Sequence, residues 1–260
     1  MLDRRTFIKA GACGGATVLA ASTSTGAAST NPYGVGGYGY RLPKLAKGSR
    51  LLFLGDSITD MKWGRNERDR NHYLGHSYVY LIASRLGVDM PEAQLEFFNR
   101  GISGHKVSDL KARWQEDAID MKPDLLSILI GVNDVSRGGG KRVPLDRWET
   151  DYRFILDASR KADAGLPLVL LDPFVLRSGR LKNETAWEHW RGEVDKLRAI
   201  VAQLAKDYDA IHVKTQEVFD AAAKAVSPEH WIWDGVHPLP QGHELIARNW
   251  LQKVSGRFSK

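Results

Sequence analysis

Residues with the chemistry for acyl transfer occur at four places in the chain. They are Ser57, Gly104, Asn133 and the pair formed by Asp234 and His237. A serine hydroxyl becomes an effective nucleophile beside a base, and a histidine base needs an acid that holds its ring in one tautomer. Backbone N–H groups and an asparagine amide are neutral donors suited to a tetrahedral oxyanion. Each of these residue types also has an ordinary structural explanation.

Ser57 lies in the segment GDSITD at residues 55–60, directly after the apolar run at 51–54. A serine at a glycine turn after a buried strand can present its hydroxyl at the edge of a sheet. The alternative is a helix N-cap, a position that serine favours. The segment is not Gly-x-Ser-x-Gly, so the usual nucleophile elbow is absent.

Two further polar segments follow apolar runs in the same way. Residues 101–104 (GISG) hold two glycines, which allow a tight turn from which the Gly104 N–H can face an oxyanion. Residues 131–134 (GVND) place Asn133 and Asp134 after another run. An ordinary strand-to-helix turn also explains the first segment, and Asn and Asp are common turn residues in general.

Asp234 and His237 are three residues apart in the segment WDGVHP at 233–238. On a loop, both side chains can turn toward one point, as an acid that orients a histidine base must do. The alternative is half of a metal site, with His243 as the nearest extra ligand. The sequence has no HExxH motif, and its one cysteine, Cys13, rules out an all-cysteine zinc site.

The elements that must position these residues alternate along the chain. Short apolar runs predict strands that are covered on both faces, at 51–54, 95–99, 125–130, 168–171 and 210–213. Apolar residues at three- and four-residue spacing predict helices at 73–86, 106–121, 145–164, 184–208 and 242–254. This alternation predicts an α/β fold with a parallel sheet. Ligands of such sheets bind beyond the carboxyl ends of the strands, where the polar segments fall.

Together, the polar segments resemble the motifs of the SGNH hydrolases, also called the GDSL esterase family. The matching motifs are GDS at 55–57, GISG at 101–104, GVND at 131–134 and DGVH at 234–237. The resemblance covers about residues 50–255, and the four motifs in one order make it specific. It implies a three-layer α/β/α sandwich around a five-stranded parallel sheet of order 2-1-3-4-5, as in flavodoxin-like folds.

The resemblance also implies roles for individual residues. Ser57 corresponds to the nucleophile, His237 to the general base and then acid, and Asp234 to the residue that orients His237. The backbone N–H groups of Ser57 and Gly104, with the Asn133 amide, correspond to the oxyanion hole. The implied reaction runs through an acyl-enzyme that water hydrolyses, with no metal or organic cofactor.

Within this family, the chain looks most like the GDSL-type acetyl xylan esterases, which remove acetate from xylan or its oligosaccharides. Aromatic faces bind sugars, and Trp63, Trp231 and Trp233 are candidates for such faces, with core packing as the alternative. In that group the tryptophan before the aspartate borders the site, a role that falls on Trp233. Members of the group form large homo-oligomers, which suggests self-association. Lysophospholipase, thioesterase and arylesterase activities use the same triad and stay open, as does a carbohydrate-binding protein with an idle hydrolase fold.

The N-terminal segment has the layout of an export signal. The string DRRTFIK at residues 3–9 resembles the bacterial twin-arginine signal, and the apolar stretch at 10–21 is too short to span a bilayer well. The resemblance implies a signal at 1–30, export to the periplasm or beyond, and no stable membrane insertion after cleavage. Acetyl xylan esterases of this group are usually intracellular, so export leaves another acetylated polysaccharide open as the substrate.

The remaining sequence divides simply. Residues 31–48, rich in Gly, Tyr and Pro, predict a linker or an N-terminal strap, and residues 49–260 predict the hydrolase domain. The formal net charge is +6 over 260 residues, and the lysines and arginines are scattered. A nucleic-acid interface needs clustered cations, so the sequence argues against that partner.

Overall fold

The computed structural model describes residues 42–135 and 144–258. Five strands form one parallel sheet in the order β2-β1-β3-β4-β5. The predicted α/β class and strand order are therefore confirmed, whereas the predicted signal at 1–30 lies outside the described residues. The strands are β1 (Arg50–Gly55), β2 (Glu96–Gly101), β3 (Leu125–Leu129), β4 (Leu168–Leu171) and β5 (Ile211–Val213).

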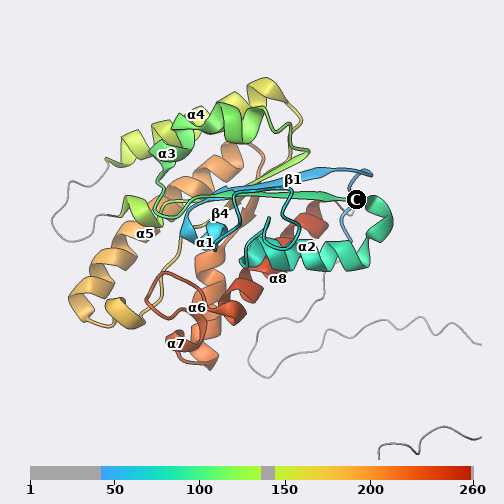
Figure 1. Ribbon diagram of the computed structural model, residues 1–260. Helices are drawn as coiled ribbons and strands as arrows, with labels where there is room; N and C mark the ends of the chain where they lie inside the picture. The colour runs from blue at the N-terminus through green and yellow to red at the C-terminus, as the bar shows by residue number, and fades with distance from the viewer. Residues whose placement is uncertain (1–41, 136–143, 259–260) are drawn as a thin grey trace, which may run out of the picture.

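Helices cover both faces of this sheet (Figure 1). One layer contains α3, α4 and α5, and α4 contacts both of the others. The other layer contains α2, α6 and α8, and α8 contacts both of the others. These helices are α2 (Tyr78–Asp89), α3 (Val107–Ala112), α4 (Leu145–Ala162), α5 (Glu184–Asp207), α6 (Thr215–Ala225) and α8 (Pro240–Phe258). Shorter segments are α1 (Ser57–Asp60), α7 (Pro228–Trp231), a π turn η2 (Gln115–Ile119) and the 3₁₀ turns η1 (Pro91–Ala93), η3 (Val132–Asp134) and η4 (Gly179–Leu181).

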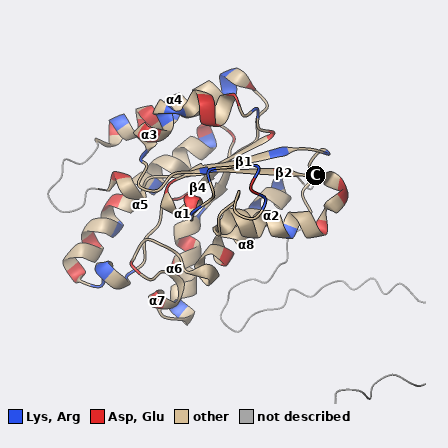
Figure 2. Ribbon diagram, viewed as in Figure 1, with Lys and Arg blue, Asp and Glu red and all other residues tan. Residues whose placement is uncertain are grey.

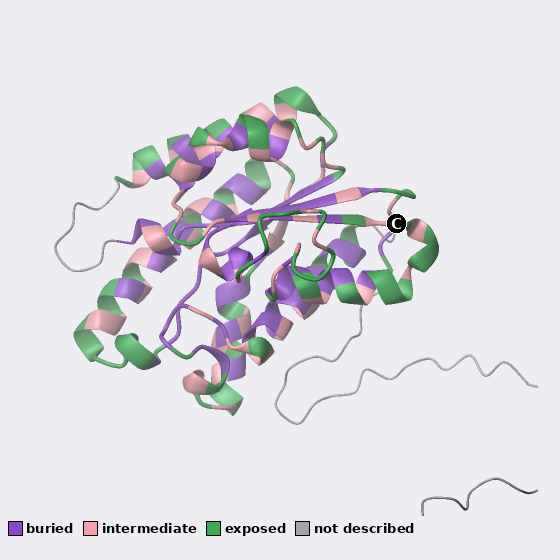
Figure 3. Ribbon diagram, viewed as in Figure 1, coloured by how far each residue is buried: buried purple, intermediate pink, exposed green. Residues whose placement is uncertain are grey.

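The sheet is the centre of the core. Side chains from Leu51 through Leu54 in β1 and all of β4 are buried, because helices lie over both faces (Figure 3). Lysine, arginine and the acidic residues lie mainly on the outward faces of the helices (Figure 2). Burial on both faces explains why these strands are continuous apolar runs rather than alternating patterns.

The helices differ from the sequence expectations at α2, α3, α6 and α8, of which α8 spans Pro240–Phe258 rather than 242–254. Helix α2 begins at Tyr78 rather than at 73, because the Ser77 side chain caps it by accepting a hydrogen bond from the Val79 N–H. The expected helix at 106–121 is divided into α3 and the π turn η2, and the Arg113 side chain at the break bonds the Arg100 carbonyl. Helix α6 was not predicted, although its buried residues follow helical spacing.

The fold brings the carboxyl ends of β1, β2 and β3 to one edge of the sheet. Residues Gly55, Gly101 and Leu129 end these strands in register, with β1 between its two neighbours. The segments that carry Ser57, Gly104 and Asn133 begin directly beyond this edge. The parallel sheet therefore places the polar segments of the sequence at one edge.

Candidate active site

Ser57 occupies the first turn of the short helix α1. The residue before it, Asp56, is the N-cap, and its carboxylate accepts a hydrogen bond from the Ile58 N–H at 3.0 Å. The alternative explanation of Ser57 as a helix N-cap is therefore wrong, since Asp56 fills that position. Buried Ile58 and Thr59 anchor the turn in the core, and the Ser57 hydroxyl is left free to interact with the opposite loop.

The loop from 233 to 237 turns Asp234 and His237 toward each other. A bridge between Ile232 and Pro238 and a hydrogen bond from the Trp233 N–H to the His237 carbonyl close its base. The Asp234 carboxylate then accepts hydrogen bonds from the loop's own backbone, at 2.7 Å from the His237 N–H. This closed loop fixes both side chains before any substrate is present.

A line of hydrogen bonds joins the serine to the aspartate. His237 Nε2 lies 2.9 Å from Ser57 Oγ, and His237 Nδ1 lies 2.8 Å from Asp234 Oδ2. Since a carboxylate accepts hydrogen bonds, Nδ1 carries the proton and Nε2 accepts from the serine hydroxyl. Residues separated by 180 positions in the sequence thus form the arrangement of a nucleophile, a base and an orienting acid.

Asp234 stays ionised although it is almost fully buried. Burial alone opposes ionisation, but hydrogen bonds from the His237 side chain and from the backbone N–H groups of His237 and Val236 lower the pKa of Asp234 well below its ordinary value. The Arg180 guanidinium lies 3.6 Å from Oδ2 of the same carboxylate. An ionised acid in this place stabilises the imidazolium that forms when a histidine takes a proton.

Gly104 occupies a turn that needs a positive backbone angle. Its φ is +85°, and the turn is closed by a hydrogen bond of 3.2 Å from the His105 N–H to the Ile102 carbonyl. A glycine with positive φ at the third position is typical of a type II turn. A Cβ on Gly104 would meet nothing within 4 Å, so the conformation and not the available space demands glycine.

Asn133 lies in the 3₁₀ turn η3 after β3. Its Nδ2 donates a hydrogen bond of 3.1 Å to the carbonyl of His105, the residue that follows Gly104. An amide group carries two N–H donors, so this bond holds the side chain against the Gly104 turn and leaves its second N–H available. The structure thus links Asn133 to the turn that contains Gly104.

Two backbone donors at this edge are unsatisfied. The N–H groups of Ser57 and Gly104 have no hydrogen-bond acceptor among the described residues. Unpaired donors that are held rigidly near a nucleophile are suited to a developing oxyanion, because they need no reorganisation when charge appears. The residues predicted as an oxyanion hole therefore offer the donors that the chemistry requires.

Two other carboxyl groups lie beneath this edge. Burial raises the pKa of Asp56 to about 7, although the Ile58 N–H and His237 oppose that rise, and burial raises the pKa of Asp134 to about 7 as well. Burial therefore favours the neutral form of both groups, so they carry less negative charge near neutral pH than exposed carboxyl groups would.

A second Asp–His pair lies farther along the same edge, at β4 and β5. His212 Nε2 is 2.6 Å from Asp172 Oδ1, and Arg198 Nε is 3.3 Å from the other oxygen of this carboxylate. Here Nε2, the ring nitrogen that meets a serine in the other pair, is the one that bonds the acid. Because Arg198 and His212 both contact the Asp172 carboxylate, we interpret this pair as part of a structural ion-pair cluster.

The three tryptophans considered as sugar-binding faces have different environments, and Trp231, at 7% exposed, is buried, contrary to that expectation. Trp63 is 6% exposed, its Nε1 donates to the Gly101 carbonyl at 2.9 Å, and guanidinium groups of Arg65 and Arg100 lie over its ring. The expectation that Trp63 presents a face to a sugar does not agree with this burial. Trp233, in contrast, is 60% exposed beside Asp234.

Sequence reasoning missed three polar side chains at this edge. Asp60 and Arg65 join α1 to the Gly104 turn, and Arg180 approaches the Asp234 carboxylate. Their pairing follows no helical or strand periodicity, so the sequence contains no signal for it. Over residues 42–135 and 144–258, no cluster of three His, Cys, Asp or Glu side chains could hold a metal ion. Within those same ranges, no helix is long and apolar enough to cross a membrane.

Comparisons with known proteins agree with this geometry. The model of the GDSL-like Lipase/Acylhydrolase family matches residues 53–245. An acetylxylan esterase of Geobacillus stearothermophilus is 36% identical over 218 residues, an alignment that covers 81% of this chain and 96% of that enzyme. The crystal structure of a GDSL-like lipase from Parabacteroides merdae, whose function is assigned only provisionally, superimposes with a TM-score of 0.76 at 34% identity and covers 83% of this chain and 99% of that one.

Solved structures of the Geobacillus esterase include catalytic mutants in which a serine, an aspartate or a histidine is replaced by alanine. These structures superimpose on this chain with TM-scores of 0.71 to 0.72 at 34–36% identity, covering 81% of this chain and 96% of the other. The family match spans most of the chain, including both ends of the hydrogen-bonded line. The chain belongs to the GDSL-like lipase/acylhydrolase family and is a carboxylic ester hydrolase.

Proposed function

We propose that this protein is a serine esterase that removes O-acetyl groups from a carbohydrate such as acetylated xylan or its oligosaccharides. The observation that carries the proposal is the hydrogen-bonded line from Ser57 through His237 to Asp234. Similarity to an acetylxylan esterase over most of both chains supports the acetyl-carbohydrate substrate. Neither a metal nor an organic cofactor takes part in the proposed reaction.

The first half of the reaction forms an acyl-enzyme. Ser57 Oγ attacks the carbonyl carbon of the acetyl ester while His237 Nε2 accepts the hydroxyl proton. The carbonyl oxygen becomes an oxyanion, which accepts hydrogen bonds from the Ser57 and Gly104 N–H groups and the Asn133 amide. The tetrahedral intermediate then collapses, and the sugar oxygen leaves with the proton that His237 returns.

The second half releases acetate. A water molecule gives a proton to His237 Nε2 and attacks the acetyl-Ser57 carbonyl, which passes through a second oxyanion in the same hole. Collapse of this intermediate returns the proton to Ser57 Oγ and frees the acid. Throughout both halves, Asp234 remains ionised and stabilises the imidazolium form of His237.

The exposed indole of Trp233 supports a sugar as the alcohol part of the ester. Trp233 directly precedes Asp234 in the chain, and 60% of its surface is exposed. An aromatic face of this kind lets the apolar side of a sugar ring pack while its hydroxyl groups remain hydrated. We propose that Trp233 contributes to sugar binding.

The decisive experiment measures acetate release from a panel of acetylated polysaccharides and oligosaccharides. Peracetylated monosaccharides and matched 4-nitrophenyl acetate and octanoate esters complete the panel. We expect turnover of acetylated saccharides and of the acetate ester, with little turnover of the octanoate ester. Equal turnover of the two nitrophenyl esters would instead favour a lysophospholipase, thioesterase or arylesterase activity and overturn the acetyl-carbohydrate assignment.

Two variants separate the proposed triad from the second Asp–His pair. Ser57→Ala removes the proposed nucleophile, and we expect it to abolish ester turnover while the fold remains intact. His212→Gln changes the pair at β4 and β5, and we expect it to keep kcat within about twofold because His212 Nε2 bonds the Asp172 carboxylate rather than a serine hydroxyl. Retained turnover in Ser57→Ala would refute a serine acyl-enzyme.

We also propose that residues 1–30 act as a twin-arginine signal, that residues 31–48 form a linker or N-terminal strap, and that residues 49–260 form the hydrolase domain. Arg4 and Arg5 carry this proposal. Replacing both by Lys and assaying esterase activity in periplasmic and cytoplasmic fractions tests it, since loss of periplasmic activity is expected. Self-association stays a prediction, which light scattering of the purified protein checks.

A further inference from the structure

The nucleophile helix and the oxyanion turn are joined by a single carboxylate. Asp60, the last residue of α1, is 2% exposed, and its Oδ2 accepts hydrogen bonds from the Ser103 N–H at 2.9 Å and the Ser103 hydroxyl at 2.7 Å. Ser103 is the residue directly before Gly104. Asp60 is three positions after Ser57, so one short helix carries the nucleophile as its first residue and, as its last, the carboxylate that binds Ser103.

Arg65 holds the same carboxylate oxygen. Its Nη2 lies 2.7 Å from Asp60 Oδ2, and its Nη1 donates to the Gly101 carbonyl at 3.0 Å. Although burial opposes ionisation, the hydrogen bonds from Arg65 and Ser103 lower the pKa of Asp60. The guanidinium thus connects the acid to the end of β2, directly before the oxyanion turn.

The backbone at the end of β2 has little room to move next to the Asp60 carboxylate. A Cβ on Gly101 would lie 2.4 Å from the Asp60 backbone nitrogen, so the end of β2 packs against α1 at a distance that glycine alone permits. The Ile102 N–H also donates to the Gly55 carbonyl at 3.1 Å. The turn from Ile102 to His105 therefore starts from a fixed point.

The orientation of one peptide group decides whether Gly104 can act as a donor. Type I and type II turns differ mainly by a rotation of the central peptide, which here joins Ser103 to Gly104. That rotation would point the Gly104 N–H in the opposite direction. Hydrogen bonds hold the turn on both sides of this peptide. Before it, Ser103 donates two hydrogen bonds to Asp60, and after it, the Asn133 amide donates one to the His105 carbonyl.

We propose that Asp60, held by Arg65, is a positioning residue that fixes the Ser103–Gly104 peptide so that the Gly104 N–H faces the oxyanion. This inference rests on the proposed function, in which the Gly104 N–H stabilises the transition state. Asp60 acts through Gly104 and touches no reacting atom. Its replacement therefore lowers kcat and leaves KM nearly unchanged, because the oxyanion exists in the transition state and not in the bound ester.

The test measures kcat and KM for an acetyl ester with graded variants. Complete loss of one oxyanion donor costs about 10²–10³ in kcat, so we expect Asp60→Ala to lower kcat by roughly 30- to 100-fold, below that limit. Asp60→Asn keeps an acceptor for Ser103 but loses the charge that pairs with Arg65, and we expect a loss of about 3- to 10-fold. The Asn variant keeps the test informative if the Ala variant fails to fold.

A matched control is available in α4. Asp151 is 4% exposed, and its Oδ1 lies 2.6 Å from Lys111 Nζ, so it is another buried carboxylate paired with a cation. Asp151→Asn should lower the melting temperature to a degree comparable with Asp60→Asn but keep kcat within about twofold. A fall in kcat that merely follows lost stability would appear in both variants and overturn the inference.

Double variants identify the donor through which Asp60 acts. The losses from Asp60→Ala and Gly104→Ala should not multiply, because both displace the same N–H. For Asp60→Ala combined with Asn133→Ala, the fold-loss in kcat should be closer to the product of the two single losses, because the Asn133 amide is a separate donor. Binding of an alkylboronic acid, which forms a tetrahedral adduct with an active-site serine, should weaken in parallel with kcat.

The outcomes separate this inference from the proposed function. If Ser57→Ala is inactive while Asp60→Ala keeps a normal kcat, or if its loss appears in KM, the positioning role of Asp60 is refuted and the esterase stands. Multiplying losses in the Asp60 and Gly104 double variant refute it as well. If Ser57→Ala remains active, the proposed function itself fails.

Discussion

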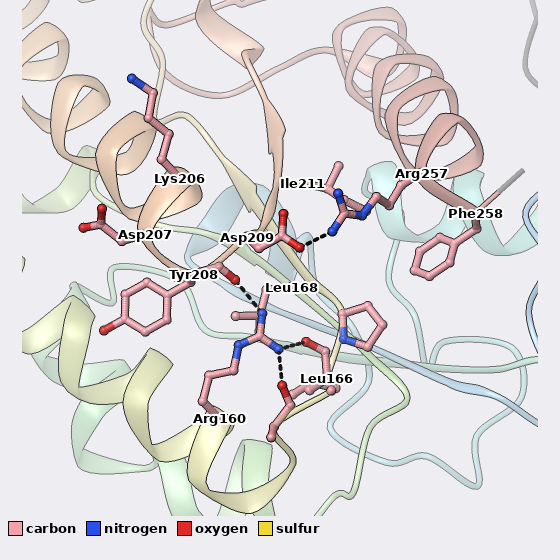
Figure 4. Close-up of a pocket in the computed structure, with 13 residues that line it drawn as sticks. Arg160, Leu166, Leu168, Lys206, Asp207, Tyr208, Asp209, Ile211, Arg257 and Phe258 are labelled. Carbon is pink, nitrogen blue, oxygen red and sulfur yellow. Dashed lines mark hydrogen bonds and ion pairs between the residues drawn. The ribbon is translucent and has the colours of Figure 1, made fainter. Parts of the chain in front are cut away.

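The polar groups at the two ends of the sheet differ in whether the fold provides them with hydrogen-bond partners. At the amino-terminal ends of β4 and β5, a pocket of about 630 Å³ is lined by Arg160, Lys206 and Arg257 among other residues (Figure 4). The Arg160 guanidinium donates hydrogen bonds to three backbone carbonyls, and Arg257 is paired with Asp209. These arginines are charged and accessible, but their guanidinium groups are already hydrogen-bonded or paired within the protein.

At the carboxyl-terminal end the situation is reversed. The Ser57 and Gly104 N–H groups have no acceptor in the described part of the chain, and Gly104 keeps a φ of +85°. The Asp234 carboxylate is ionised although it is buried. A reactive site therefore depends on polar groups that the fold orients and on backbone donors that it leaves unpaired, whereas volume and charge by themselves do not make one.

The largest expected effect comes from the acid of the triad. Asp234→Asn keeps the shape of the side chain, but its amide can hold His237 in the wrong tautomer, and we expect kcat to fall by about 10⁴. Asp209→Asn should leave kcat unchanged, since the Asp209 carboxylate pairs with Arg257 at the opposite end of the sheet. Steady-state kinetics on an acetyl ester check both, and a loss of less than tenfold in Asp234→Asn would contradict the assigned role.

Two glycines with nearly equal backbone angles give a sharper comparison. Gly104 and Gly48 have φ values of +85° and +78°, and a Cβ on either would meet nothing within 4 Å. Alanine costs about 1–2 kcal/mol in this conformation, so at Gly104 the turn should change and kcat should fall by about 10²-fold with KM retained. Gly48→Ala should affect only stability, and equal kinetics in the two variants would show that Gly104 holds no special donor.

Acid should remove a stabilising contribution of one buried imidazole, whereas protonation of Asp56 and Asp134, whose pKa values burial raises to about 7, acts in the opposite direction. Burial lowers the pKa of His243 to about 3, and its Nδ1 accepts from the Tyr78 N–H, which requires the neutral form. The unfolded chain titrates near 6.5, so stability is complete above that pH and is lost as pH falls toward 3. The expected loss from this group is about 2 kcal/mol at pH 5.

Denaturant unfolding of wild type and His243→Gln at pH 8 and pH 5 measures this contribution. Glutamine keeps an acceptor for the Tyr78 N–H but does not titrate, so the change in unfolding free energy from pH 8 to pH 5 should be more favourable in the variant by about 2 kcal/mol. Asp56 and Asp134 titrate in both proteins, and their contribution cancels in this difference. An identical change in both proteins would show that His243 makes no pH-dependent contribution.

The smallest effect is expected in the pocket of Figure 4. Arg257 and Asp209 are 52% and 79% exposed, and exposed pairs contribute about 0–1 kcal/mol. Arg257→Gln should therefore change the free energy of unfolding by less than about 0.5 kcal/mol and leave kcat unaltered. A measurable loss of esterase activity would show that this end of the sheet takes part in the function.

Much of the architecture followed from local pattern. The apolar runs predicted the five strands to within two residues, and strand–helix alternation predicted a parallel sheet whose carboxyl edge holds the site. The order of the strands came instead from the resemblance. Helix α6 was not predicted from the sequence, because its apolar positions follow a short, weakly apolar strand. The break at Arg113 was not predicted either, because a tertiary hydrogen bond from the Arg113 side chain to the Arg100 carbonyl competes with helix continuation.

The sequence by itself determined which residue types stand beyond each strand, because each strand and the turn after it are contiguous in the chain. Only the tertiary structure decided that Ser57 meets His237 across 180 residues, that Trp63 lies in the core while Trp233 remains exposed, and that Asp60 bonds Ser103. These outcomes depend on distances between segments that are far apart along the chain. Local propensity carries no information about such distances, which the packing of both helix layers on the sheet sets.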